Sequence, residues 1–293
     1  MAGAERPIQA LNLRAGALAL VAWCIALHAS AQPPPLALEG RLVQGGYAVG
    51  RTAPNAQVLV DGRAAGAASA DGLFVVGFDR DSAARVEVRV RTPDGEADRT
   101  LQIAAGVFDI QRIDGLPQDQ VTPTDPALLA RIAAERARKA VGFASLAAGT
   151  HFTQPFILPV PGARLSARFG GQRILDGEPK QPHYGDDLAA PVGTPVLAPA
   201  DGVVAFAETG LHYEGGLIMI DHGQGLISLY LHLSRVDVSP GQAVRQGQVI
   251  AAVGQEGRAT GPHLCWRMKW RGRNLDPMLL VRGAAGAAPD MKR

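Results

Sequence analysis

The segment at residues 261–266 carries two side chains that are suited to metal chemistry. It reads Gly-Pro-His-Leu-Cys-Trp. In an extended strand successive side chains alternate between the two faces, so His263 and Cys265 would point the same way. A neutral imidazole and a thiolate are both ligands that Zn²⁺ accepts in proteins. The segment therefore predicts part of a zinc site whose remaining ligands come from elsewhere in the chain.

The best partners lie about eighty residues upstream, where His183 and Asp187 are four positions apart. That spacing places two side chains on one face of either a helix or a strand. Pro182, Gly185 and Pro191 argue against a helix. We therefore expect His183 and Asp187 on a strand or an extended loop.

A third segment, residues 227–234, gives the clearest strand pattern of the chain. Strict alternation over this length is typical of a strand with two different faces. The alternation places His232 on the polar face. The apolar side would hold Ile227, Leu229, Leu231 and Leu233, and the polar side Ser228, Tyr230, His232 and Ser234.

The order of these motifs resembles the M23 (LytM-type) zinc metallopeptidases, which cut peptide bonds in bacterial peptidoglycan. The matching patterns are H-x-x-x-D, then Y-x-H-L-S, then G-P-H-L-x-W. The resemblance covers roughly residues 156–280. Several ordered motifs make it far more specific than a single short motif. Further matches are S-A-R-F-G at 166–170, A-P-V-G-T-P-V at 190–196, I-D-H-G at 220–223 and G-Q-V-I at 247–250.

The resemblance implies a role for each residue of the predicted site. His183, Asp187 and Cys265 would hold one Zn²⁺, while His232 and His263 would flank it as catalytic residues. The family usually has H-L-H where this chain has His263-Leu264-Cys265, so a cysteine occupies the place of the third zinc ligand. The other interpretation of Cys265 is a small buried hydrophobic residue.

Three classes of function remain open. The first is a zinc metalloendopeptidase that hydrolyses peptidoglycan stem peptides or cross-links, and the retained histidines and aspartate favour it. The second is a catalytically inactive M23-like protein that binds or activates another cell-wall hydrolase, such as an amidase, and only Cys265 favours it. The third is a cysteine hydrolase that uses Cys265 and His263, which would leave His183 and Asp187 without a role.

Residues 1–31 have the features of a secretory signal peptide. Arg6 and Arg14 precede and open an apolar stretch at 15–27, and Ala-Ser-Ala at 29–31 is a cleavage motif. Cleavage would remove Cys24 and export the protein to the periplasm or cell envelope. The alternative is an uncleaved membrane anchor.

The rest of the chain divides into two predicted β domains joined by a helix. Short apolar runs separated by Asp-Gly turns predict a small immunoglobulin-like β-sandwich at 36–113. Residues 114–152 form a linker and a helix, with Asp125 as N-cap and Pro126 in the first turn. Arg131, Arg136, Arg138 and Lys139 are expected on a solvated face of that helix.

The second β domain is predicted at 153–282, and the resemblance implies an antiparallel sheet with the site in a groove. Residues 283–293 would be a flexible tail. The formal net charge of +2 is too small to indicate nucleic-acid binding. Peptidoglycan peptides are the expected partners, with no membrane contact after signal cleavage.

Overall fold

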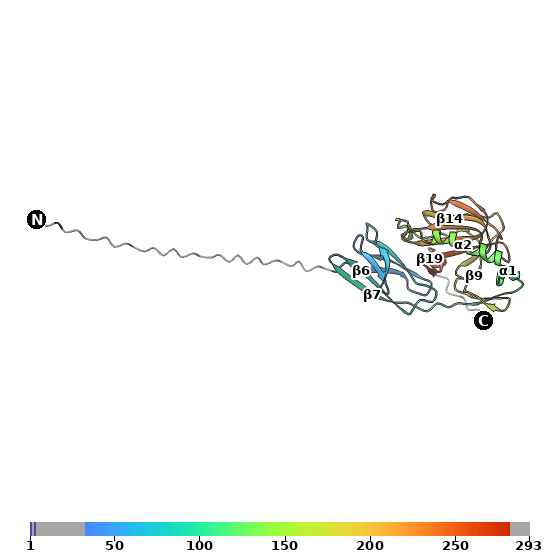
Figure 1. The fold of residues 1–293 in the computed structure, drawn as a ribbon, viewed down its shortest axis with the longest axis horizontal. Coiled ribbons are helices and arrows are strands. Elements are labelled where there is room, and N and C mark those ends of the chain that lie inside the picture. The colour runs from blue at the N-terminus through green and yellow to red at the C-terminus, as the bar shows by residue number, and fades with distance from the viewer. Residues whose placement is uncertain (2, 4–32, 282–293) are drawn as a thin grey trace. The chain divides into compact units, whose positions relative to one another are not determined.

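The structure is a computed structural model that describes residues 1, 3 and 33–281 (Figure 1). The predicted signal peptide and the predicted tail at 283–293 lie outside the described residues. Within the described part of the chain, no helix is long and apolar enough to cross a membrane. The fold is mainly β, with an N-terminal sandwich, a connecting helix and a C-terminal antiparallel sheet, which confirms the predicted fold class.

Two small antiparallel sheets form the N-terminal sandwich. The inner residues of β6 alternate with exposed ones, and Val86, Val88 and Val90 are all buried. Asp61 and Gly62 take positive φ angles in the tight turn that the Asp-Gly pair predicts. One sheet contains β1 (Ala37–Arg41), β2 (Tyr47–Arg51) and β5 (Leu73–Gly77); the other contains β3 (Gln57–Val60), β4 (Arg63–Ala67), β6 (Arg85–Thr92) and β7 (Gly95–Gln102).

The segment after the sandwich runs to the C-terminal domain rather than remaining with the first sheets. The strand β8 (Ile110–Ile113) pairs in parallel with β10 (Gln172–Leu175), which also pairs with β11 (Glu178–Pro179). A short helix, α1 (Gln118–Val121), follows. This connection places residues from the linker beside the groove described below.

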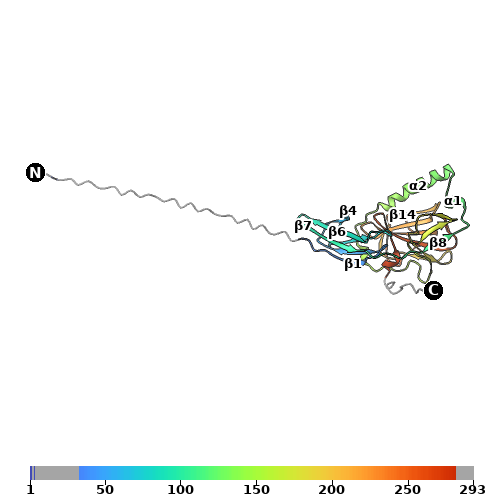
Figure 2. The same cartoon turned by 90° about the horizontal axis from the view of Figure 1, so that it is seen from below.

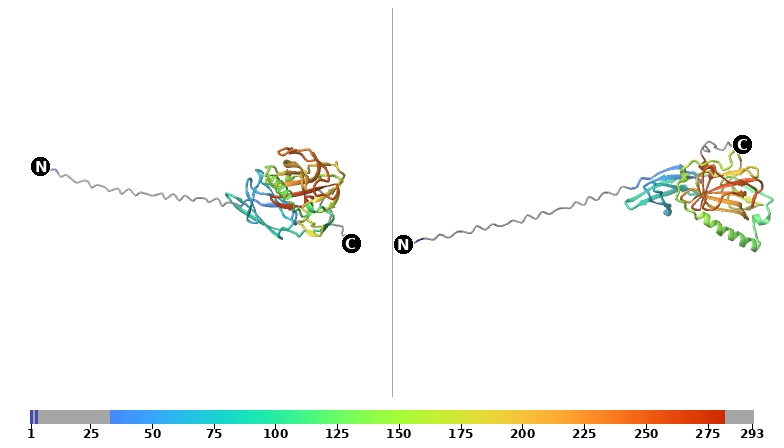
Figure 3. Two further views of the ribbon diagram at one scale, coloured as in Figure 1. Left: turned by 45° about the vertical axis from the view of Figure 1, so that its right-hand side comes forward. Right: turned by 90° about the horizontal axis from the view of Figure 1, so that it is seen from above.

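The long helix α2 (Pro126–Phe143) begins as the sequence predicts. The Asp125 carboxylate accepts hydrogen bonds from the backbone N–H groups of Ala127 and Leu128. The helix packs against β14 (Gly202–Leu211), and Figures 2 and 3 show it along the outside of the C-terminal sheet. A side chain at Gly142 would clash with Met219 and Phe206, so glycine permits this close approach.

The expectation that the basic residues of α2 lie on a solvated face holds for Arg131 and Arg138, whose side chains are 54% and 49% exposed, whereas Lys139 is only 14% exposed. All three form ion pairs. Their partners are acidic side chains, and two of the partners lie on or beside the C-terminal sheet. Glu135 is buried between α2 and the C-terminal sheet, where it also accepts a hydrogen bond from the backbone N–H of His212. The pairs are Arg131–Glu135, Arg138–Glu208 and Lys139–Glu214.

A ten-stranded antiparallel sheet organises the C-terminal domain. Its main path runs β17-β14-β15-β16-β19-β12-β9, so β19 lies between β16 and β12. The 3-10 helices are η1 (His151–Thr153) and η2 (Pro277–Leu280). The other strands of this sheet are β9 (Arg164–Ala167), β12 (Asp186–Ala189), β13 (Pro195–Leu197), β15 (Gly215–Asp221), β16 (Leu226–Val236), β17 (Ala243–Val244), β18 (Val249–Val253), β19 (His263–Trp270) and β20 (Arg273–Leu275).

The predicted alternation of β16 holds as far as Leu231 and then breaks at His232. His232 has φ of 66°, and the pairing of β16 shifts register on both sides of this point. Leu233 therefore joins a different hydrophobic cluster from Leu231, so the prediction of one continuous apolar side is wrong. The side predicted to be polar is also buried, because both faces of this central strand are covered.

The sandwich and the C-terminal sheet share one hydrophobic core. Gly77 at the end of β5 lies so close to Trp270 and Leu275 that a side chain there would clash with both. The Arg273 guanidinium donates a hydrogen bond to the Gly77 carbonyl at 3.0 Å, and the Asn274 N–H donates to the Asp79 carboxylate at 3.0 Å. This junction ties the sandwich to the same strands that carry the candidate site.

Candidate metal centre

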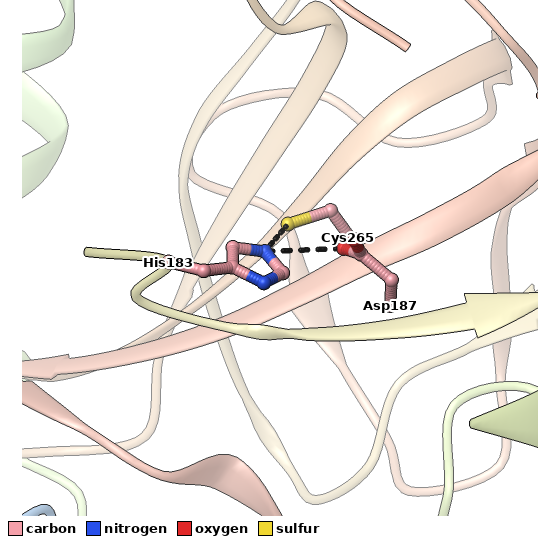
Figure 4. Close-up of side chains that lie close together, drawn as sticks. All are labelled: His183, Asp187 and Cys265. Atoms are coloured by element: carbon pink, nitrogen blue, oxygen red, sulfur yellow. Dashed lines mark hydrogen bonds and ion pairs between the residues drawn. The ribbon is translucent and has the colours of Figure 1, made fainter. Parts of the chain in front are cut away.

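Strand register brings the predicted ligands together. In the antiparallel pair β12 and β19, Asp187 lies directly opposite Cys265, which places their side chains on one face as close neighbours. His183 reaches the same point from the loop before β12 (Figure 4). Its Nε2 atom lies 3.2 Å from Asp187 Oδ1 and 3.3 Å from Cys265 Sγ. The three side chains are buried.

The geometry of these three donors fits a zinc ion. Tetrahedral zinc with bonds of about 2.0–2.3 Å to nitrogen, oxygen and sulfur separates its ligand atoms by about 3.3–3.6 Å. The two measured separations are close to that range, and all three donor atoms lie within 4.8 Å of one another. Asp187 Oδ1 is buried and makes no hydrogen bond to any described residue. A cation would satisfy it.

Asp187 is held as a carboxylate. Burial by itself raises the pKa of Asp187, but contact with His183, the neighbouring His263 ring and the charge of Arg173 bring it well below the ordinary value. His263 Nε2 lies 3.6 Å from Asp187 Oδ1, and the Arg173 guanidinium lies 3.6 Å from Oδ2. The ionised form is the one that binds a metal.

His232 lies beside these donors with one ring nitrogen fixed. Its Nδ1 is 2.7 Å from the Glu256 carbonyl oxygen. A carbonyl only accepts, so Nδ1 carries the proton and Nε2 keeps a free lone pair. Burial lowers the pKa of His232 to about 4, which keeps the ring neutral at pH 7. Its left-handed backbone, rare for a residue other than glycine, is typical of strained functional positions.

His263 repeats this arrangement from the start of β19. Its Nδ1 donates to the Gly261 carbonyl at 2.8 Å, so its Nε2 is also left free. The ring centroids of His263 and His232 are 4.8 Å apart. Burial lowers the pKa of His263. Two neutral imidazoles, each with an available lone pair, thus stand next to the three donors.

Three arginines of the site were missed by the sequence analysis. Arg267 is partly buried and its Nε donates to Cys265 Sγ at 3.3 Å. Its position two residues after Cys265 on a strand was a usable signal, since alternate residues share a face. Arg173 and Arg258 come from β10 and from the loop before β19, and no local pattern connects them.

The remaining histidines and the second aspartate have other roles. His222 is buried and makes hydrogen-bond contacts with the Asp201 carbonyl and Ser228. Asp186 is buried and accepts a hydrogen bond from the Phe169 N–H. The His212 backbone donates to Glu135, and its ring contacts the Asp119 carbonyl at 3.2 Å, so it braces the two helices against the sheet. Of the described residues, His183, Asp187 and Cys265 are the ones grouped closely enough to hold a metal ion.

A groove of about 670 Å³ runs along the site. Asp187 and His263 form part of its floor, and β8 forms one side. At its inner end a cavity of about 40 Å³ also reaches His232. Three of the predicted site residues, Asp187, His232 and His263, therefore line spaces that an extended ligand could enter from solvent.

Comparison with known proteins assigns this domain to a family. Residues 181–277 match the model of peptidase family M23. The peptidoglycan DD-endopeptidase ShyA of Vibrio cholerae is 40% identical over 127 residues, which cover 43% of this chain and 29% of that protein. The DD-carboxypeptidase/endopeptidase Mpg of Neisseria meningitidis is 41% identical over 122 residues, which cover 42% of this chain and 28% of that protein.

These matches span less than a third of the length of the two relatives. A solved structure extends the likeness beyond the matched domain. A Pseudomonas aeruginosa protein assigned to peptidase M23 is 28% identical, with a TM-score of 0.62, over 82% of this chain and 95% of that chain. The chain therefore carries a peptidase family M23 domain at residues 181–277.

Proposed function

We propose that the protein is a zinc metalloendopeptidase that hydrolyses peptide bonds in peptidoglycan stem peptides or cross-links. The observation that carries this proposal is the meeting of three donors, from His183, Asp187 and Cys265, next to two neutral imidazoles. The names of the relatives support the same substrate class. The export predicted for residues 1–31 would deliver the protein to that substrate.

The chain's own residues supply positioning and proton transfer. Zinc, when bound, supplies Lewis acidity that polarises a peptide carbonyl and acidifies water. His232 Nε2 is available as a general base because its partner nitrogen is committed to the Glu256 carbonyl. His263 Nε2 lies 3.6 Å from Asp187 Oδ1 and can hydrogen-bond the reacting groups. The groove holds the peptide in an extended form along β8 and β12.

The geometry gives less support to the two alternatives. A cysteine hydrolase needs an accessible thiol, whereas Cys265 is completely buried. An inactive protein would have no use for the two oriented imidazoles of His232 and His263.

Two variants separate a metal ligand from a proton-transfer group. Asp187→Ala should lose most of the zinc and the release of peptides from cell-wall sacculi. His232→Ala should keep its zinc and lose about 10²-fold or more in rate. Asp186→Asn is the matched control, because this neighbouring carboxyl faces the opposite side of β12 and should leave zinc content unchanged.

The measurements are zinc by elemental analysis and peptide release by chromatography. Equal zinc in the wild type and in Asp187→Ala would disprove the ligand assignment. A zinc-loaded wild type that releases no peptide at any pH would instead support the inactive alternative.

A further inference from the structure

The inner cavity of the groove is lined by more positive charge than the protein neutralises. Arg173 and Arg258 face it together with Asp187, His232 and His263. Its volume of about 40 Å³ is room for about three water molecules, since one needs about 10–15 Å³ on the same measure. The wider groove shares Arg173, Asp187 and His263 with this cavity, so a ligand in the groove reaches it.

Arg173 has unused hydrogen-bonding capacity. Its side chain is only 15% exposed, and its Nε is buried without a hydrogen-bond partner among the described residues. The nearest carboxylate, Asp187, is 3.6 Å away, which is too long for a good hydrogen bond. A buried donor left unpaired is costly, so this guanidinium is poised to bind an acceptor that enters the cavity.

Contacts with Gln120 and Tyr213 hold the Arg258 side chain at the same cavity. Its Nη1 donates to the Gln120 carbonyl at 3.1 Å, and the guanidinium lies 4.8 Å from the centre of the Tyr213 ring. These contacts fix its plane and leave other N–H groups free to turn toward the cavity. Burial, and then the nearby charges of Arg173 and Arg267, lower the pKa of Arg258, and Tyr213 and Glu214 oppose this only in part.

Charge balance at the site points in the same direction. Arg267 donates to Cys265. Asp187 would be committed to the metal ion, because its Oδ1 is a predicted ligand. Arg173 and Arg258 would then share the cavity with a divalent cation, and the one carboxylate near them, Asp187, would face Arg173 at 3.6 Å only through Oδ2. A guanidinium pair in a confined site matches the two oxygens of a carboxylate.

We propose that Arg173 and Arg258 form a carboxylate-binding subsite, so that the preferred substrate is an acidic peptide with a carboxylate close to the scissile bond. The inference rests on the proposed peptidase function and specifies its substrate class. Neutral peptides of the same length would bind in the groove without filling the subsite. The carboxylate can come from a side chain or from a free C-terminus.

Matched peptides test the proposal through binding. One synthetic cross-linked stem peptide is made in four forms, with the side-chain carboxyl free or amidated and the C-terminal carboxyl free or amidated. Calorimetric titration uses the zinc-loaded full chain carrying His232→Ala, so that hydrolysis does not interfere. We expect an acid form to bind about 10- to 100-fold more tightly than its amide, the usual range for a charge-assisted hydrogen bond. If the affinity changes when the side-chain carboxyl is amidated, the carboxylate comes from the side chain. If it changes when the C-terminal carboxyl is amidated, the carboxylate comes from the C-terminus.

Substitutions then locate the effect. Arg173→Gln or Arg258→Gln, in the same background, should reduce the preference to about threefold or less. Arg164→Gln is the matched control, since Arg164 lines the wider groove and not the inner cavity; it should preserve the preference. Arg173→Lys and Arg258→Lys keep the charge without the planar fork and should restore part of the preference, which a purely structural role would not predict.

The proposal is overturned if the wild-type cavity shows no preference, or if the preference survives at full size in both glutamine variants. Should a glutamine variant fail to fold, an undiminished preference in both lysine variants overturns it equally. A separate assay of hydrolysis uses the protein with His232 intact. Preferred binding without any hydrolysis in that assay would refute the proposed peptidase function and leave the subsite standing.

Discussion

His222 offers a quantitative test of the buried hydrogen-bond network behind the site. The residue is completely buried, with Nδ1 2.7 Å from the Asp201 carbonyl oxygen and Nε2 2.7 Å from Ser228 Oγ. The carbonyl only accepts, so Nδ1 donates and Nε2 accepts from the Ser228 hydroxyl. Ser228 Oγ in turn accepts from Tyr230 Oη at 2.7 Å. These hydrogen-bond directions hold only when His222 is neutral, because Nε2 must accept a hydrogen bond.

Acidification should therefore cost stability. Burial lowers the pKa of His222 from 6.5 to about 4, although the Asp201 carbonyl partly opposes this. As pH falls from about 7.5 to 4.5, the unfolded chain takes up a proton at this residue before the folded chain does. The free energy of unfolding should fall by about 2–3 kcal/mol over that interval, at about 1.4 kcal/mol for each unit of pKa difference. The loss should level off below the folded pKa.

The perturbation is His222→Gln, which keeps a donor and an acceptor and cannot titrate near neutral pH. Urea unfolding of both proteins at several pH values gives the two free energies of unfolding, and their difference removes the contribution of every other titrating group. The wild type should lose about 2–3 kcal/mol more than the variant between pH 7.5 and 4.5. Parallel curves would refute the reasoning, because they would show that His222 does not stay neutral in the folded protein.

Three further predictions concern the site and its support. Cys265→Ala should lower zinc affinity by more than about 100-fold, which is more than the usual effect of changing a residue that only hydrogen-bonds a ligand. Cys265→His should keep zinc, and competition with a chelator measures the affinity of both variants. Full zinc content in the alanine variant would show that Cys265 is a packing residue. Burial raises the pKa of Asp186, as does its neighbour Asp276, so the protonated form stabilises the fold and this contribution is lost as pH rises through the raised pKa. Asp186→Asn should therefore be more stable than the wild type at neutral pH in thermal unfolding, and an unchanged or lower Tm would argue against a protonated Asp186. Removing residues 32–150 should reduce the stability of the C-terminal domain, because it exposes Trp270 and removes β8, the partner of β10. Gly77→Val should lower the free energy of unfolding by about 1–3 kcal/mol through overpacking at the same junction. A truncated domain with the Tm of the full chain would contradict the shared core.

Local patterns were sufficient for several elements. The Asp125 cap and Pro126 set the start of α2 because capping depends only on neighbouring backbone N–H groups. Alternation predicted β16 up to Leu231, and the two-residue period placed His263 and Cys265 on one face of β19. The identity of the candidate ligands followed from ordered motifs, since donor types and spacing are properties of the sequence itself.

Only the tertiary structure decided how those residues meet. Strand register sets Asp187 opposite Cys265, and no local signal fixes which residues of two distant strands face each other. The left-handed backbone at His232 breaks the alternation that predicted its surroundings, because pairing with two neighbouring strands overrides the strand's own pattern. Arg173 and Arg258 are far apart in the sequence and share a cavity only in the folded protein, where β8 pairs with β10, since long-range packing has no period that a single sequence displays.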